Sequence, residues 1–177
     1  MRGLVFTELF ELIEEKFGYG FLDDVIDASK INNDGAYTAV GNYPFDELLS
    51  LVVSLSEKSS IPIPDLLELF GEALFPKLMQ AFPHLVKDID LIDFIENVET
   101  YIHVEVKKLY PDTELPSFEI IYKDKDKIEF NYISDKKLQH LAKGLLVGAS
   151  KHFGNPVNIK MTDRGDKVNF IIAIQDS

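Results

Sequence analysis

Residues 117–133 have the sequence SFEIIYKDKDKIEFNYI, and this stretch decides the fold class. Within its first six and its last six positions, apolar and polar residues alternate at residues 117–120 and 128–132, which is the pattern of half-buried strands. The charged run KDKDK between them is typical of a hairpin turn. Two more alternating segments follow at residues 157–161 and 168–174. The C-terminal part of the chain therefore predicts two strand pairs in one antiparallel sheet.

The chain before residue 116 has helical spacing instead. Apolar residues recur every three or four positions through residues 4–17, 22–26, 44–55, 62–82 and 89–110. Pro111 ends the last of these helices, and another helix over residues 136–153 separates the strand pairs. We therefore predict an α+β fold, with an N-terminal helical subdomain and C-terminal helices packed on a four-stranded antiparallel sheet. The length of 177 residues suits a single domain.

Charge and composition exclude several classes of protein. Eighteen Lys and Arg residues against thirty Asp and Glu give a net charge of -12, which disfavours nucleic-acid and anionic-membrane partners. The absence of cysteine rules out disulfides, thiolate zinc sites and nucleophilic thiols, and fits a reducing compartment. Four glutamates in the first apolar run exclude a secretory signal, and no stretch approaches the ~18 apolar residues of a membrane span. We expect a cytoplasmic protein.

His103 is the candidate metal ligand, in the run IHVEVKKLYPD at residues 102–112. An inward-facing neutral imidazole is the commonest protein ligand of haem iron, although a half-buried helical histidine is more often a packing residue. Further along the chain, Tyr132, Ser134 and Lys136 occupy alternate positions. On an extended segment these side chains point the same way, and two hydroxyls with a cation suit a pair of carboxylates.

These stretches and several others together resemble the H-NOX family, the haem nitric oxide/oxygen-binding domains of bacterial sensors and of soluble guanylate cyclase. The resemblance covers essentially the whole chain, and its joint order and spacing make it specific. The other matching stretches are MRGLVF at 1–6, FG at 17–18, AYT at 36–38, YP at 43–44, LFG at 69–71, FPH at 82–84, LPSF at 115–118 and GLLVG at 144–148.

The resemblance implies haem b held between a distal subdomain, approximately residues 1–60, and a proximal subdomain, residues 61–177. His103 would bind the iron, and Pro116 would press on the haem and distort it. Tyr132, Ser134 and Lys136 would hold the propionates. Lysine stands here where the family has arginine, which replaces a planar two-pronged donor by a mobile point charge.

The resemblance also assigns a gas-facing wall. Its members are all aliphatic: Val5, Leu9, Leu74, Leu141 and Leu145. Bound oxygen needs a hydrogen-bond donor, and nitric oxide on ferrous iron depends on one much less, so this wall favours nitric oxide. Ordinary core packing would account for the same leucines without a cofactor.

The function so implied is that of a haem-based nitric oxide sensor, also binding carbon monoxide, that is not itself an enzyme. Its expected partner is a histidine kinase or a diguanylate cyclase or phosphodiesterase. Nitric oxide would weaken the bond from iron to His103 and bias a two-state domain. Two alternatives remain open: a cofactor-free protein-interaction module, and a non-haem metal hydrolase that uses Glu99 or Glu105 beside His103.

Overall fold

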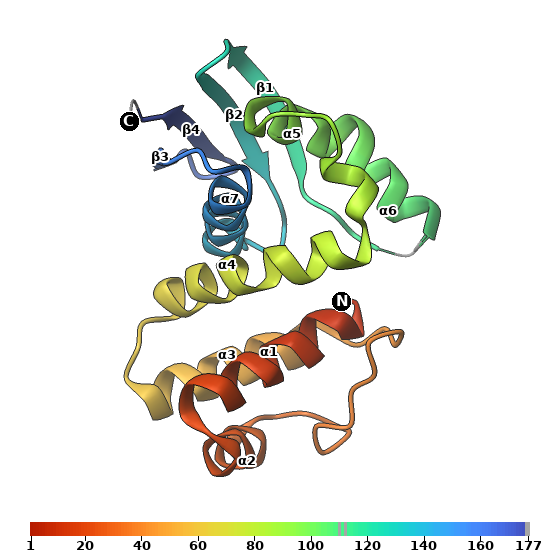
Figure 1. Ribbon diagram of the computed structural model, residues 1–177. Coiled ribbons are helices and arrows are strands. Elements are labelled where there is room, and N and C mark those ends of the chain that lie inside the picture. Colours follow the sequence, from red (N-terminus) through yellow and green to blue (C-terminus); the bar gives the residue numbers. More distant parts are fainter. Residues whose placement is uncertain (110, 112, 176–177) are drawn as a thin grey trace. The chain divides into compact units, whose positions relative to one another are not determined.

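The computed structural model describes residues 1–109, 111 and 113–175 (Figure 1). The chain forms two compact units, Met1–Phe70 and Gly71–Ser177. The boundary falls inside one continuous helix, α4 (Ile63–Ala81), whose first turns belong to the first unit and whose remainder belongs to the second. None of the described helices is long and apolar enough to cross a membrane.

The first unit is helical. It contains α1 (Gly3–Phe17), α2 (Tyr19–Ala28), α3 (Phe45–Ser59) and the start of α4. Gly18 takes a φ of 89°, which residues with a Cβ rarely adopt, and this lets α2 begin directly after α1. The apolar stripes predicted from the sequence meet in a core that includes Phe6, Leu9, Ile13 and Leu51.

A buried carboxylate lies in the first unit. Glu47 is 5% exposed, and its carboxylate accepts hydrogen bonds from the Tyr37 hydroxyl at 2.7 Å and the Asn32 amide at 3.1 Å. Burial raises the pKa of Tyr37 well above its usual range, and the neighbouring Glu47 adds to the effect. The phenol is therefore a neutral donor that satisfies the buried acid.

The second unit carries the sheet. After α4 come η1 (Pro83–Val86), α5 (Leu91–Asn97), a π-helical turn η2 (Val98–Ile102) and α6 (His103–Leu109). The strands β1 (Ser117–Lys123) and β2 (Lys127–Ile133) precede α7 (Gln139–Phe153), and β3 (Val157–Asp163) and β4 (Val168–Ile174) follow it. All neighbouring strands are antiparallel, in the order β1-β2-β4-β3. The α+β fold predicted from the alternating segments is confirmed.

The core of this unit forms between one face of the sheet and the helices. Ile128, Phe130 and Tyr132 of β2 are buried together with Phe170 and Ile172 of β4, and α5 and α7 cover this face (Figure 1). Helices α4 and α7 cross closely because glycine occupies the contact. A Cβ on Gly71 would lie 2.3 Å from the carbonyl oxygen of Leu141, closer than atoms can approach.

The prediction of one regular helix over residues 89–110 is wrong in its middle. The π-helical turn η2 separates α5 from α6, and the N–H of His103 bonds to the carbonyl of Val98, five residues back. The inserted residue shifts the helical phase without disturbing the apolar spacing on either side, so the sequence pattern does not reveal it. Tyr110, the predicted last residue of this helix, lies outside the described residues.

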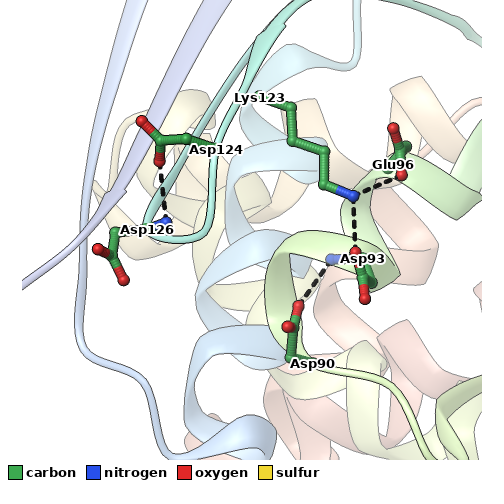
Figure 2. A network of polar contacts seen from close by, with 6 residues as sticks. All are labelled: Asp90, Asp93, Glu96, Lys123, Asp124 and Asp126. Atoms are coloured by element: carbon green, nitrogen blue, oxygen red, sulfur yellow. Dashed lines mark hydrogen bonds and ion pairs between the residues drawn. The ribbon is translucent and has the colours of Figure 1, made fainter.

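A lysine from β1 anchors the start of this helical segment (Figure 2). Lys123 Nζ lies 2.6 Å from both Asp93 Oδ1 and Glu96 Oε2 of α5, and the Asp90 carboxylate caps α5 by accepting the N–H of Asp93. A bulge between Ile120 and Tyr122 shifts the strand alternation by one residue. Lys123 therefore pairs with the buried Ile128 and reaches the helices.

Candidate functional site

His103 begins α6 immediately after the π-helical turn, and its side chain is 14% exposed. Its Nδ1 lies 3.1 Å from Glu99 Oε2. Among the residues that the structure describes, no hydrogen bond involves Nε2. Burial lowers the pKa of His103, and the Glu99 carboxylate opposes that effect less strongly. The imidazole is therefore neutral at neutral pH, which is the form that binds metals.

Glu99 connects the histidine to the sheet. The same oxygen that meets Nδ1, Oε2, accepts the backbone N–H of Phe118 at 3.2 Å. The carboxylate thus joins the π-helical turn to the first residues of β1. Within the described ranges, no group of three or more His, Asp or Glu side chains could hold a metal ion, and Glu99 is occupied as an acceptor.

Phe118 continues the contact toward β2. Its ring centroid lies 5.5 Å from that of His103, at an interplanar angle of 70°, and 5.8 Å from that of Tyr132, at 85°. Both are edge-to-face arrangements, which aromatic rings prefer to a flat stack. Glu99, His103, Phe118 and Tyr132 thus form one continuous set of contacts from four elements, η2, α6, β1 and β2.

Tyr132 and Ser134 lie at the end of β2. The Tyr132 side chain is buried and belongs to the core of the second unit. Burial raises the pKa of its phenol, while hydrogen bonds to the Ser134 side chain and the Leu138 backbone act in the opposite direction. The phenol therefore stays protonated and able to donate at neutral pH.

Lys136 does not lie on the strand, so the expectation of three side chains on one extended segment is wrong. β2 ends at Ile133, and residues 134–137 form a turn in which the N–H of Lys137 donates to the carbonyl of Ser134 at 3.2 Å. The Ser134 hydroxyl accepts the N–H of Lys136 at 3.3 Å, which favours the turn over the strand. Tyr132 and Ser134 are nonetheless hydrogen-bonded neighbours.

The Lys136 ammonium lies against a carboxylate. Nζ is 2.5 Å from Glu114 Oε2, with the lysine side chain 19% exposed and the glutamate side chain 84% exposed. The pair lowers the pKa of Glu114 through hydrogen bonding and charge. Lysine in this turn is thus placed to neutralise a carboxylate.

The other predicted site residues fall in both units. In the second unit, Leu74 and Leu141 are buried, and Leu145 and Pro116 are half-buried. Leu141 and Leu145 provide the backbone atoms closest to Gly71 at the crossing of α4 and α7. Val5 and Leu9 belong to α1 in the first unit, where Leu9 is buried and Val5 is half-buried.

Comparison with known proteins identifies the family. The sequence profile of the haem-NO-binding family matches residues 2–161. The chain belongs to the H-NOX family. H-NOX domains bind haem and sense gases, so the haem cofactor predicted from the sequence is that of the family. No protein with a curated function matches the sequence.

Solved structures support the same assignment. An unliganded Fe(II) H-NOX mutant, A71G, from K. algicida is 35% identical, with a TM-score of 0.95, and the match covers 100% of this chain and 98% of that one. An H-NOX protein from S. oneidensis in the Fe(II)NO state is 26% identical, with a TM-score of 0.91 and coverage of 99% and 100%. The IWP-051-bound H-NOX from Shewanella woodyi, in the Fe(II)CO state, is 40% identical, with a TM-score of 0.84 and coverage of 98% and 94%.

Two residues that contact His103 in this H-NOX chain, Glu99 and Phe118, were not predicted as parts of the site. Glu99 entered the sequence argument only as a possible metal ligand, and Phe118 only as part of a matching motif. The spacing of four residues between Glu99 and His103 indicates that they are neighbours on a helix. Nothing in the local pattern places Phe118 beside them, because that contact joins a helix to a strand.

Proposed function

We propose that this H-NOX chain is a sensor of nitric oxide that binds haem b and regulates a separate signalling protein, without being an enzyme itself. The observation that carries the proposal is His103, a half-buried neutral imidazole with Nδ1 held by Glu99 and no hydrogen bond to Nε2 in the described part of the chain. That arrangement leaves one ring nitrogen available to iron.

The donor set fits haem. His103 would bind the iron through Nε2, and Tyr132, Ser134 and Lys136 would hold the propionates with two hydroxyls and a cation. Lys136 already neutralises one carboxylate, that of Glu114, which supports its role toward another. Pro116 immediately precedes β1, whose Phe118 ring contacts the ring of His103, and it would press on the haem. When bound, haem would supply an iron atom that can take a diatomic gas.

The residues assigned to the gas-facing wall favour nitric oxide. Val5, Leu9, Leu74, Leu141 and Leu145 have no side-chain hydrogen-bond donor, so they offer nothing to stabilise bound oxygen. Nitric oxide and carbon monoxide need such a donor much less. A similar H-NOX protein from S. oneidensis has been solved with nitric oxide bound, and the S. woodyi protein with carbon monoxide bound.

The output in this proposal passes through protein contact. A histidine kinase or a diguanylate cyclase or phosphodiesterase is the proposed partner, and the cytoplasm the proposed location. His103 would couple the state of the haem to the helical segment that carries it. A partner with different affinities for the two states would then respond to the gas.

An absorption spectrum of the purified protein tests the cofactor, and anaerobic titration of the ferrous protein with nitric oxide tests the ligand. We expect a Soret band that shifts with one equivalent of nitric oxide. His103→Gly should lose the haem, and free imidazole should restore it. A colourless protein after expression with added haem precursor would instead favour a cofactor-free interaction module, and an unchanged His103→Gly spectrum would exclude His103 as the ligand.

A further inference from the structure

The contact between Glu99 and His103 is more than a helical ion pair on the protein surface. The histidine side chain is 14% exposed and the glutamate side chain 39% exposed, so the pair is partly removed from water. One carboxylate oxygen faces both Nδ1 of His103, at 3.1 Å, and the N–H of Phe118, at 3.2 Å. The sheet therefore fixes the carboxylate that faces the ring.

The hydrogen bond determines which imidazole nitrogen carries the proton. A carboxylate only accepts hydrogen bonds, so a neutral imidazole facing it through Nδ1 must carry its proton there. The lone pair then lies on Nε2. Metal-binding histidines commonly donate their second ring nitrogen to a carboxylate or a carbonyl, which orients the ring and makes the binding nitrogen more basic.

The backbone geometry supports a positioning role. Glu99 lies within the π-helical turn and His103 follows it directly, and the N–H of His103 bonds to a carbonyl five residues back in place of four. Such turns are rare and occur frequently at functional sites. The turn lets the carboxylate reach the imidazole and the start of β1 together.

We propose that Glu99 is the positioning residue of the iron site, holding His103 in the Nδ1–H tautomer and increasing electron donation from Nε2 to iron. This inference rests on the proposed function, because it takes His103 as the iron ligand. It adds a residue that sets the strength of the iron–histidine bond, and with it the ease with which nitric oxide breaks that bond.

Glu99→Gln is the decisive variant, because glutamine has the same size and retains an oxygen that can accept from Nδ1 and from Phe118. It removes the negative charge and replaces the other carboxylate oxygen by an amide NH2 group. Glu105→Gln is the matched control: it removes one charge two residues after His103, from a carboxylate that pairs with Lys108 at 2.6 Å. A charge effect acting only through space would appear in both variants.

The readouts are the iron–histidine stretching frequency of the ferrous protein by resonance Raman spectroscopy, the haem reduction potential, and the rate of haem transfer to apo-myoglobin. In Glu99→Gln we expect a lower stretching frequency, a higher potential and a faster transfer, on the order of 10-fold. The nitrosyl form should contain a larger five-coordinate fraction. Glu105→Gln should stay close to the wild type in these three readouts and in the five-coordinate fraction of the nitrosyl form.

A purely structural role for Glu99 predicts a different result. Glutamine would then leave the stretching frequency unchanged, and only Glu99→Ala would act, by reducing the hydrogen-exchange protection of the Phe118 amide. That result, or equal values for Glu99→Gln and Glu105→Gln, would overturn the inference. If His103→Gly abolishes iron ligation while the two glutamine variants agree, only this inference fails. If His103→Gly keeps the wild-type spectrum, the proposed iron ligand fails with it.

Discussion

Lys136 Nζ lies 2.5 Å from Glu114 Oε2, and the two partners differ greatly in their contact with water. The lysine side chain is mostly buried in the turn after β2, while the glutamate side chain is 84% exposed. Water screens so exposed a carboxylate, and it therefore holds the lysine only weakly. A propionate in the proposed site would therefore compete with Glu114 for the same ammonium group.

The first prediction follows from that competition. Glu114→Gln should slow haem transfer to apo-myoglobin, because it removes the competing carboxylate from Lys136. Lys136→Ala should speed the transfer modestly, by less than about tenfold, and Lys136→Arg should slow it by gripping the carboxylate with two donors. The Asp135→Asn variant, next to Lys136 and exposed, is the control for a change in charge. If Lys136→Ala leaves the rate of haem transfer unchanged, Lys136 does not bind a propionate.

The second prediction concerns oxygen. The ferrous protein should bind nitric oxide and carbon monoxide but form no stable oxygen complex in air, because Leu9, Leu74 and Leu141 carry no hydrogen-bond donor. Absorption spectra of the reduced protein before and after exposure to each gas measure this. A stable oxygen complex of the wild type would contradict the aliphatic wall.

The third prediction concerns Tyr37 and the buried Glu47. Tyr37→Phe removes a 2.7 Å hydrogen bond and leaves the carboxylate with fewer donors, which should cost about 1–3 kcal/mol of unfolding free energy in urea titrations. Tyr19→Phe is the control: it removes the hydroxyl of a tyrosine that is 73% exposed, and it should change the unfolding free energy little. Equal stability of the two variants would show that Glu47 finds another donor.

The same tyrosine makes stability depend on pH. The pKa of Tyr37 is raised in the folded protein, so the unfolded chain loses this proton first as the pH rises. The contribution is complete below the ordinary tyrosine pKa of about 10 and is lost as the pH rises through the higher folded value. Urea titrations of the wild type should therefore show a steeper fall in stability above pH 10 than those of Tyr37→Phe.

The fourth prediction concerns the anchor of α5. Lys123→Met should lower the unfolding free energy by only about 1 kcal/mol, because both carboxylate partners are more than 40% exposed and water screens the pairs. Since the ion pairs raise the pKa of Lys123, their contribution is complete below the ordinary lysine pKa and is lost as the pH rises through the folded value. Added salt should reduce the difference between variant and wild type. A difference that is large and independent of salt would indicate that packing of the lysine stem dominates.

Local patterns of the sequence were enough to predict the fold class. The spacing of apolar residues depends on which side of a helix or strand faces the core. The helix over residues 4–17 and the strand pair over residues 117–133 could therefore be recognised without knowing which elements pack against them. The family assignment, confirmed by the match over residues 2–161, came from the order of many short motifs. His103 was predicted as the metal ligand from its residue type and from the sequence that surrounds it. Its role as iron ligand remains a prediction.

The contacts around that histidine depend on the tertiary structure. The π-helical turn before His103 leaves no mark in the apolar spacing, and the hydrogen bond from Phe118 to Glu99 joins residues 19 positions apart. Lys136 was expected beside Tyr132 and Ser134 on an extended segment, but Ser134 accepts its N–H and the chain turns, which brings the ammonium to Glu114. Local sequence was enough to predict the main helices and strands and the residue types available for the chemistry. Which side chain contacts which depends on the three-dimensional arrangement, because hydrogen bonds act over about 3 Å and join residues that the periodicity of a single element cannot relate.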